Sequence, residues 1–347
     1  MQPIRFAALF LLAFMASAAT HAIEIDTVSV GNPGNPADTR YLDAEHPAGV
    51  GSVGYSFRIG KTEITNAQYA AFLNAVAASD PYGLYHEIYM QQTWGGVVRS
   101  GDDGNYAYAV KDPALSGAYP YDNKPVMFVS WGDAARFVNW LHNGQPTGAA
   151  DATTTEDGAY PLHGATTAAE LIGVARNPGA KWWIPTEDEW YKAAYHKNDG
   201  VTGNYWNFPT ASDSEPDNNL PTADTGNSIN ARSWSGNYTT GDYNYSLTDA
   251  GAYTQSASSY GTFDQGGSVW EFNERAFSGL YRGFRGGSWS NSTIDSQAAG
   301  WGRDDPTFKF VNNGFRVATI PEPSTLYGVA LAAIGLLWMG RRGTLHA

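Results

Sequence analysis

Residues 184–190 read Ile-Pro-Thr-Glu-Asp-Glu-Trp, a stretch that predicts the first turn of a helix. Thr186 is a favourable N-cap residue, and Glu189, three positions later, completes a capping box with it. Glu187 and Asp188 place negative charge at the positive end of the helix dipole. We therefore predict a helix that begins after Thr186 and turns its apolar side chains toward a core.

Two further helices and two strands are expected upstream of this stretch. Thr65 and Ser130 each cap a run of apolar residues at helical spacing, and Gly144 ends the second helix. Alternating apolar and polar residues predict strands within residues 25–30 and 55–59. The apolar faces of the helices consist of Tyr69, Phe72, Leu73 and Val76, and of Trp131, Ala134, Phe137, Val138 and Leu141.

The composition excludes several classes of function. None of the 347 residues is cysteine, which excludes disulfides, thiolate nucleophiles and thiolate metal sites. A net charge of −13 argues against nucleic acid as a partner and is compatible with the binding of cations. The 39 glycines, 21 tyrosines and 12 tryptophans indicate a loop-rich domain whose core is filled by aromatic rings.

The N-terminal segment, residues 1–22, has the layout of a secretory signal peptide. Arg5 precedes an apolar run over residues 6–16, and small residues then lead to Ala22. We therefore expect a bacterial protein that is exported to the cell envelope or the extracellular space.

The C-terminal segment, residues 321–347, has the layout of a sorting signal. A Pro-Glu-Pro start precedes an apolar stretch over residues 326–339, shorter than the ~20 residues of a membrane-spanning helix, and two arginines follow. This arrangement resembles the PEP-CTERM tail of Gram-negative bacteria, which an exosortase-type membrane protease recognises and cuts. An ordinary short anchor is the alternative. Either tail leaves the domain, residues 23–320, outside the inner membrane.

Two polar segments interrupt the regular pattern. Residues 143–180 are weakly periodic and are interpreted as an insertion with one hairpin around Gly158. Residues 210–254 are rich in Asn, Asp, Gly, Ser and Tyr and have almost no aliphatic pattern. Because a structureless loop of that length is unusual in a compact domain, and no disulfide is available, we expect an ion to organise it.

Six short phrases follow one another in a fixed order. They lie at residues 57–66, 125–131, 184–190, 267–272, 285–289 and 314–316, and the last three read Gly-Ser-Val-Trp-Glu-Phe, Arg-Gly-Gly-Ser-Trp and Gly-Phe-Arg. Together they resemble the formylglycine-generating enzyme (sulfatase-modifying factor) family. The resemblance implies a single α+β domain of that type, a variant of the C-type lectin fold, loop-rich and with few regular elements.

The resemblance also implies two structural calcium sites, since similar family members bind calcium in matching loops. Calcium takes six to eight hard oxygens from carboxylates, amides and backbone carbonyls. A solvated acidic loop is the alternative at both places. The first set comprises the side chains of Asp264 and Glu271 with the carbonyls of Gly267 and Val269, and the second the side chains of Asn230 and Asp242 with the carbonyls of Ala231 and Asn244.

Charged residues in these phrases lie beside glycines and aromatic residues. Arg285 and Arg316 are expected to fork onto carboxylates or backbone carbonyls in the core. Glu271, between two aromatic residues, is costly to bury unless a cation or an arginine pairs with it. Trp270 and Trp289 are expected to be core rings.

The residues that give the family its oxidative chemistry are absent. In the oxidase members, two cysteines after the Arg-Gly-Gly-Ser phrase bind copper, and the matching positions here hold Asn291 and Ser296. Neither residue supplies a thiolate. We therefore expect no copper and no conversion of a sulfatase cysteine to formylglycine.

Two functions remain open after this comparison. We favour a non-catalytic binding or structural module that presents its loops to a glycan or protein ligand at the cell surface. The alternative is an enzyme with a rebuilt site near Asn291, Ser296, Trp301 and Arg303. An iron site of the kind found in a related branch would need three histidines, and the five of the mature domain show no clustered spacing.

Overall fold

The computed structural model describes residues 22–116 and 119–321. The predicted signal peptide and the predicted sorting tail lie outside the described residues, apart from Ala22 and Pro321. Within the two described ranges, no helix is long and apolar enough to cross a membrane.

The described part of the chain combines four α-helices with ten short strands. The helices are α1 (Asn66–Val76), α2 (Trp131–His142), α3 (Ala168–Ile172) and α4 (Glu187–Tyr195), with 3-10 turns η1 (Pro113–Ser116), η2 (Pro221–Ala223) and η3 (Thr293–Ser296). The strands are β1 (Thr27–Val30), β2 (Phe57–Gly60), β3 (Val97–Ser100), β4 (Ala107–Val110), β5 (Trp182–Trp183), β6 (Trp270–Phe277), β7 (Tyr281–Arg285), β8 (Gly302–Asp304), β9 (Asn313–Gly314) and β10 (Ala318–Thr319). The expected α+β, loop-rich class is confirmed.

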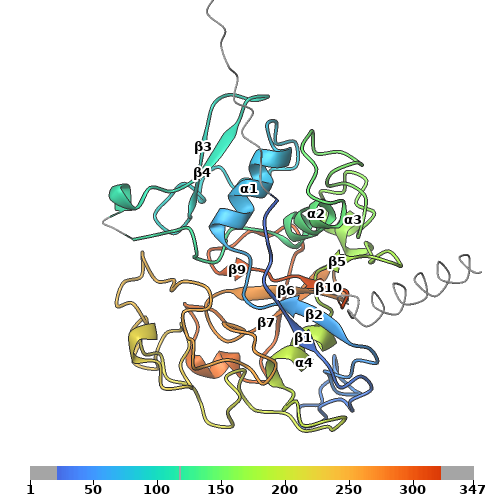
Figure 1. The fold of residues 1–347 in the computed structure, drawn as a ribbon, viewed down its shortest axis with the longest axis vertical. Helices are drawn as coiled ribbons and strands as arrows, with labels where there is room; N and C mark the ends of the chain where they lie inside the picture. Colours follow the sequence, from blue (N-terminus) through green and yellow to red (C-terminus); the bar gives the residue numbers. More distant parts are fainter. Residues whose placement is uncertain (1–21, 117–118, 322–347) are drawn as a thin grey trace, which may run out of the picture.

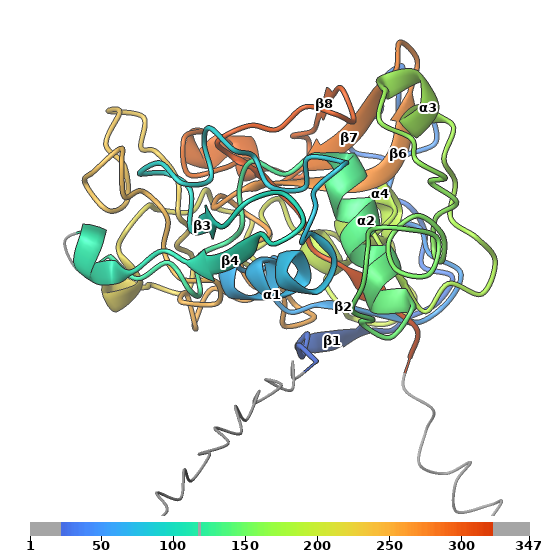
Figure 2. The ribbon, with the colours of Figure 1, turned by 90° about the horizontal axis from the view of Figure 1, so that it is seen from above.

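The strands form three small sheets (Figure 1). One has the order β1-β2-β10-β5, one is the β3-β4 hairpin, and the third has the order β8-β7-β6-β9. All pairs are antiparallel except β6 with β9, which is parallel. The first and last strands share a sheet, and Figure 2 shows β1 on one side of the domain with β7 and β8 on the opposite side.

The three predicted helices are confirmed together with their caps. Thr65, Ser130 and Thr186 each accept a hydrogen bond from the backbone N–H three residues on, and each forms a capping box. Gly144 follows α2 with a φ of +87°, a conformation that glycine adopts without steric cost. Local sequence signals therefore decide where these helices begin and end.

The prediction of a hairpin around Gly158 is wrong. Residues 143–180, all of them described, contain α3 and turns but no strand. The buried side chain of Asn139 on α2 donates to the carbonyls of Thr155 and Tyr160 and accepts from the Tyr160 N–H. Side chains of a helix therefore satisfy backbone groups that a hairpin would have paired with each other.

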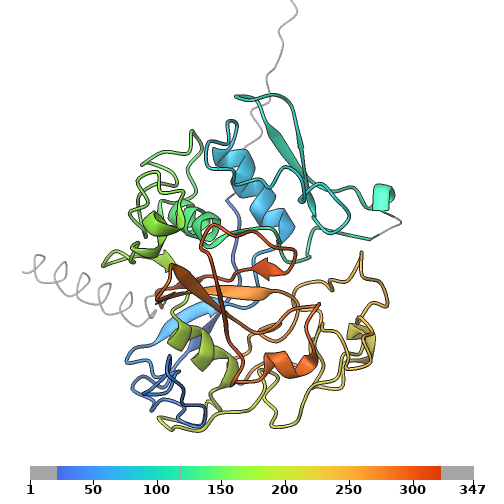
Figure 3. The same ribbon diagram turned by 180° about the vertical axis from the view of Figure 1, so that it is seen from behind.

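The long segment between α4 and β6 is held in a similar way. Figure 3 shows it as loops that run around one half of the domain, with η2 and isolated bridges as its ordered pieces. Asn227 donates to the carbonyls of Ser214 and Glu215, and Asn218 donates to the carbonyl of Asn237 at 3.0 Å. Asparagine side chains thus supply part of the order for which the sequence predicts an ion.

Aromatic rings fill the core, as the composition indicated. Phe137 of α2 lies 5.2 Å from Phe72 of α1 and 5.3 Å from Phe315, measured between ring centroids. Trp289 is buried as expected, whereas Trp270 is only half-buried. The rings join the helices to the strand segments, and this packing positions the polar groups described next.

Candidate functional site

A buried ion pair lies at the centre of the domain. Arg316 and Glu271 are both inaccessible to solvent, and the Arg316 Nη2 donates to Glu271 Oε1 at 2.6 Å. The same guanidinium donates to the carbonyls of Gly60 and Phe263, each at 2.9 Å. The indole N–H of Trp190 donates to the other carboxylate oxygen at 2.7 Å. The expectation that Arg316 would fork onto a carboxylate and carbonyls is confirmed.

Two more carboxyl groups surround this pair. Burial, reinforced by the charges of Asp264 and Glu271, raises the pKa of Glu63 well above its usual value. Both Glu63 carboxyl oxygens are buried without a hydrogen-bond partner. Burial also raises the pKa of Asp264, whose Oδ2 accepts from the Gly251 N–H. The cluster therefore holds more carboxyl groups than its one arginine neutralises.

Sequence reasoning missed Glu63. Its position between a predicted strand and the Thr65 cap predicts a connecting loop. The sequence there has no periodic pattern that would indicate a buried side chain. The available signal was its place in the phrase at residues 57–66, next to apolar Ile64.

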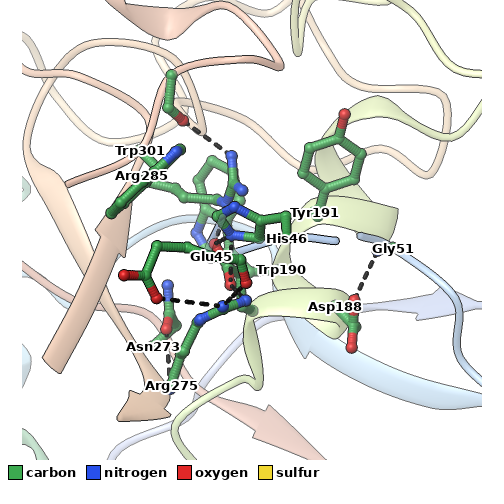
Figure 4. A network of polar contacts seen from close by, with 12 residues as sticks. Glu45, His46, Gly51, Asp188, Trp190, Tyr191, Asn273, Arg275, Arg285 and Trp301 are labelled. Carbon is green, nitrogen blue, oxygen red and sulfur yellow. Dashed lines mark hydrogen bonds and ion pairs between the residues drawn. The ribbon is translucent and has the colours of Figure 1, made fainter. Parts of the chain in front are cut away.

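A second buried carboxylate lies at the N-terminus of α4. Glu187 accepts from His46 at 3.0 Å, from Arg275 at 2.7 Å and from Arg285 at 2.8 Å. Burial alone would raise its pKa, but Arg285, His46 and Arg275 hold the pKa of Glu187 at about 2. Figure 4 shows His46, Arg275 and Arg285 converging from the N-terminal segment, β6 and β7. This network joins the loop that contains His46 to α4 and to the sheet formed by β8, β7, β6 and β9.

Arg285 behaves as predicted, because it also donates to the carbonyls of Ala298 and Gly300. Trp301 belongs to the same network. Its indole N–H donates to the Asp43 carboxylate, and its ring centroid lies 5.2 Å from that of His46. Arg303 pairs with Glu45 at 3.3 Å.

The two positions that hold cysteine in the oxidase members are engaged in hydrogen bonds. Asn291 Oδ1 accepts from the Trp270 indole at 2.9 Å. Ser296 is buried, and its hydroxyl donates to the Thr293 carbonyl at 2.7 Å. Of the four residues expected near a rebuilt site, Trp301 and Arg303 join the network around Glu187 and Glu45, while Asn291 and Ser296 have other partners.

The residues of the first predicted calcium set lie in and beside the central cluster. Asp264 and Glu271 are buried there, and Gly267 and Val269 belong to the segment that connects them. Glu271 is engaged by Arg316 and Trp190. Asp264 has a φ of +59°, a backbone conformation uncommon outside glycine.

The residues of the second predicted set differ in exposure. Asn230 is buried and its Oδ1 has no hydrogen-bond partner, which leaves a free oxygen of the kind that calcium takes. The Ala231 carbonyl accepts from Thr239, and Asp242 and Asn244 lie on the exposed part of a loop. Across residues 22–116 and 119–321, no three His, Asp or Glu side chains are arranged to hold a metal ion. Calcium binding stays a prediction.

An aromatic pocket of about 330 Å³ opens on the surface. Four of its rings are each at least 40% exposed: Tyr89, Tyr243, Phe308 and Phe310. Trp94, Phe128, Lys309 and Val311 complete the lining. Exposure of several rings in one place is uncommon on a folded domain and is a feature of many interaction sites.

Ring stacking and a backbone hydrogen bond join the segments that form the pocket. Phe128 has a φ of +60°, a strained conformation for a bulky residue, and its N–H donates to the Phe310 carbonyl at 3.0 Å. The ring of Phe128 stacks on Tyr89, and Phe308 stacks on Phe310. Lys309 is neutralised by Asp133 at 2.8 Å. The pocket therefore offers apolar faces rather than net charge.

A protein-family model described as "Sulfatase-modifying factor enzyme 1-like domain" matches residues 16–320. No curated protein matches the chain. Solved structures similar to it include CarF, with 19% identity and a TM-score of 0.48 over 86% of this chain and 99% of that chain. Treponema denticola variable protein 1 has 18% identity and a TM-score of 0.47, over 86% of this chain and 95% of that chain. PvdO from Pseudomonas aeruginosa has 15% identity and a TM-score of 0.44, over 86% of this chain and 92% of that chain.

Replacing Arg316 with methionine should destabilise the domain by about 3–5 kcal/mol, because the change leaves a buried carboxylate unpaired. Urea denaturation measures the effect. Arg303→Met is the matched control, since its ion pair is half-exposed and its loss should cost less than about 1 kcal/mol. Equal losses in the two variants would contradict the central role of Arg316.

The stability that the buried carboxyl groups contribute should fall as pH rises above about 4.3, the usual pKa of a glutamate side chain. Burial raises the pKa values of Glu63 and Asp264, and it raises the pKa of Glu274 to about 7. A raised folded-state pKa adds stability that is complete below the unfolded-state pKa and is lost as pH rises through the folded-state pKa. Glu187 acts oppositely on acidification toward about 2. Burial lowers the pKa values of two lysines to about 8, which adds stability as pH rises: Lys111 and Lys192.

Thermal melting between pH 5 and 9 in the presence of a chelator measures this dependence. Glu63→Gln should flatten the decline, because glutamine cannot ionise in the cluster. The same pH dependence in the wild type and in Glu63→Gln would contradict the assignment.

Proposed function

The chain belongs to the sulfatase-modifying factor enzyme 1-like domain family, and we propose that it is a non-catalytic binding module of that family. The absence of cysteine from all 347 residues removes the thiolates on which the oxidative chemistry depends. Asn291 and Ser296, at the two corresponding positions, donate or accept hydrogen bonds within the domain. The scaffold is thus retained without its redox groups.

The aromatic pocket is the observation that carries the binding role. Its four exposed rings and its volume of about 330 Å³ suit an apolar side chain of a protein ligand. Burying such a ring or aliphatic group there would gain about 25 cal/mol for each Å² of apolar surface removed from water. Lys309 is already paired with Asp133, so the pocket has no free charge with which to select an anionic ligand.

Export and surface display are part of the proposal. The signal-peptide layout of residues 1–22 and the Pro-Glu-Pro tail at residues 321–347 support it, and an exosortase-type protease would process the tail. Because β1 and β10 share one sheet, both ends of the domain leave from that sheet. A tail held at the membrane would leave the side with β7 and β8 facing outward (Figure 2).

Calcium is proposed as a structural ion in the set formed by Asp264, Glu271 and the carbonyls of Gly267 and Val269. The excess of carboxyl groups supports it, since a divalent cation beside them would lower the cost of their burial. The two unpartnered Glu63 oxygens and the unpartnered Asn230 Oδ1 are further oxygen donors in the interior.

An enzyme with a rebuilt site is the second candidate. It rests on His46, which is buried between Asp43 at 2.9 Å and Glu187 at 3.0 Å, beneath the ring of Trp301. Two carboxylates that orient one imidazole could serve proton transfer. Copper or iron retained after purification, or turnover that is lost in His46→Gln, would favour this candidate over the binding module.

Phe310→Ala and Phe308→Ala should each weaken ligand binding at least about tenfold, a loss of roughly 1.4 kcal/mol. A displayed peptide library selects the ligands, and biolayer interferometry measures their affinities for both variants. Tyr281→Ala is the matched control, because Tyr281 is also exposed but lies on β7, outside the pocket lining. Selected peptides that bind all three variants equally would refute a protein-binding pocket, and binding only of glycans on an array would change the ligand class.

Removal of calcium should lower the melting temperature, and Asp264→Asn should abolish the calcium response. The physical reason is mass action, since an ion that binds only the folded state stabilises it by RT ln(1 + [L]/Kd). Melting in chelator, with calcium and with magnesium measures the effect. Asp242→Asn separates the two predicted sets, because it changes only the second. Identical melting curves in chelator and calcium would contradict the proposed ion.

A further inference from the structure

A surface trough separate from the aromatic pocket lies between residues 215–218 and 233–235. Its volume is about 490 Å³, and Thr293 forms part of its wall. Trp234 stands in it with 75% of its surface exposed, more than any other large hydrophobic residue in the described part of the chain. An indole left in water forgoes the free energy that its burial would release, so covering it with a flat apolar surface would be favourable.

The ring of Trp234 is held in place before any ligand arrives. Its N–H donates to Glu215 Oε1 at 3.1 Å, and the Thr293 hydroxyl donates to that same oxygen at 2.5 Å. The backbone of the turn is closed by Ser233 N–H to the Asn237 carbonyl and by Gly236 N–H to the Ser233 carbonyl, both at 2.8 Å. A preorganised side chain loses little conformational entropy when it binds.

The chemistry of the trough selects one class of ligand. The indole offers a flat apolar face, while the carboxylates of Glu215 and Asp217 and the amide oxygen of Asn218 offer acceptors around it. The Ser233 and Ser235 hydroxyls, which bond each other at 2.8 Å, complete the polar lining. A pyranose ring has the complementary surface, with C–H groups on one face and hydroxyl groups at its edge. Of the described residues that line the trough, none is lysine or arginine, so anionic sugars would meet two carboxylates without compensation.

We propose that this trough binds a neutral sugar ring, which stacks on Trp234 while its hydroxyl groups hydrogen-bond to the carboxylate and amide side chains. The site extends the proposed binding role with a second surface and a defined ligand class. It does not depend on the aromatic pocket, because the two linings share no residue.

Isothermal titration and saturation-transfer NMR with cellotriose, maltotriose and chitotriose test the proposal, with sialyllactose as the anionic comparison. At least one neutral trisaccharide should bind with a Kd of about 1 mM or tighter, and sialyllactose should not. Trp234→Ala should weaken binding at least about tenfold, and Trp234→Phe should retain part of it. NMR should show saturation strongest at the C–H protons of one sugar face.

Two variants separate this site from the other proposals. Phe310→Ala should leave sugar binding unchanged, so loss of peptide binding and loss of sugar binding are distinguishable. Glu215→Gln should ease the exclusion of sialyllactose, since it removes one of the two carboxylate charges. Absence of binding by all three neutral sugars, or equal affinity of the wild type and Trp234→Ala, would overturn the proposal.

Discussion

Arg316 and Glu271 meet where separate parts of the chain come together, and neither side chain is exposed to solvent. The guanidinium bonds the carbonyl of Gly60 at the end of β2, the carbonyl of Phe263 in the segment before β6, and the carboxylate on β6. In a chain without cysteine, this charged contact links segments that lie far apart in the sequence. Its partners cannot be removed singly at low cost, because the remaining charge would be buried without compensation.

Features that depend on neighbouring residues, such as helix caps, were predictable from the sequence. Contacts between distant residues were predictable only where a buried charge requires a partner. Thr65, Ser130 and Thr186 marked helix starts because a cap bonds backbone groups within three residues. The pairing of Glu271 followed from the cost of burying a carboxylate. The hairpin around Gly158 was wrong because its backbone groups are bonded by Asn139, a helix residue whose reach no local pattern reveals. The burial of the unpaired Glu63 carboxyl was missed because no local pattern reveals it either.

The closing phrases of the sequence have a shared structural purpose. Glu271 on β6 lies opposite Arg285 of β7 on one side and Gly314 of β9 on the other. Arg285 then bonds Glu187, and Arg316 bonds Glu271, so the three phrases form two adjacent charge clusters. The phrases therefore maintain the scaffold of a chain that contains no cysteine. The proposed binding surfaces lie elsewhere, on aromatic residues of the connecting loops.

The central claim is that the buried pair, rather than the separate packing of its two side chains, holds the domain together. A double-mutant cycle with Arg316→Met, Glu271→Gln and the combined variant, followed by urea denaturation at neutral pH in chelator, measures it most directly. The account predicts a coupling free energy of at least about 2 kcal/mol between the two positions. Effects that add to within about 0.5 kcal/mol would contradict it.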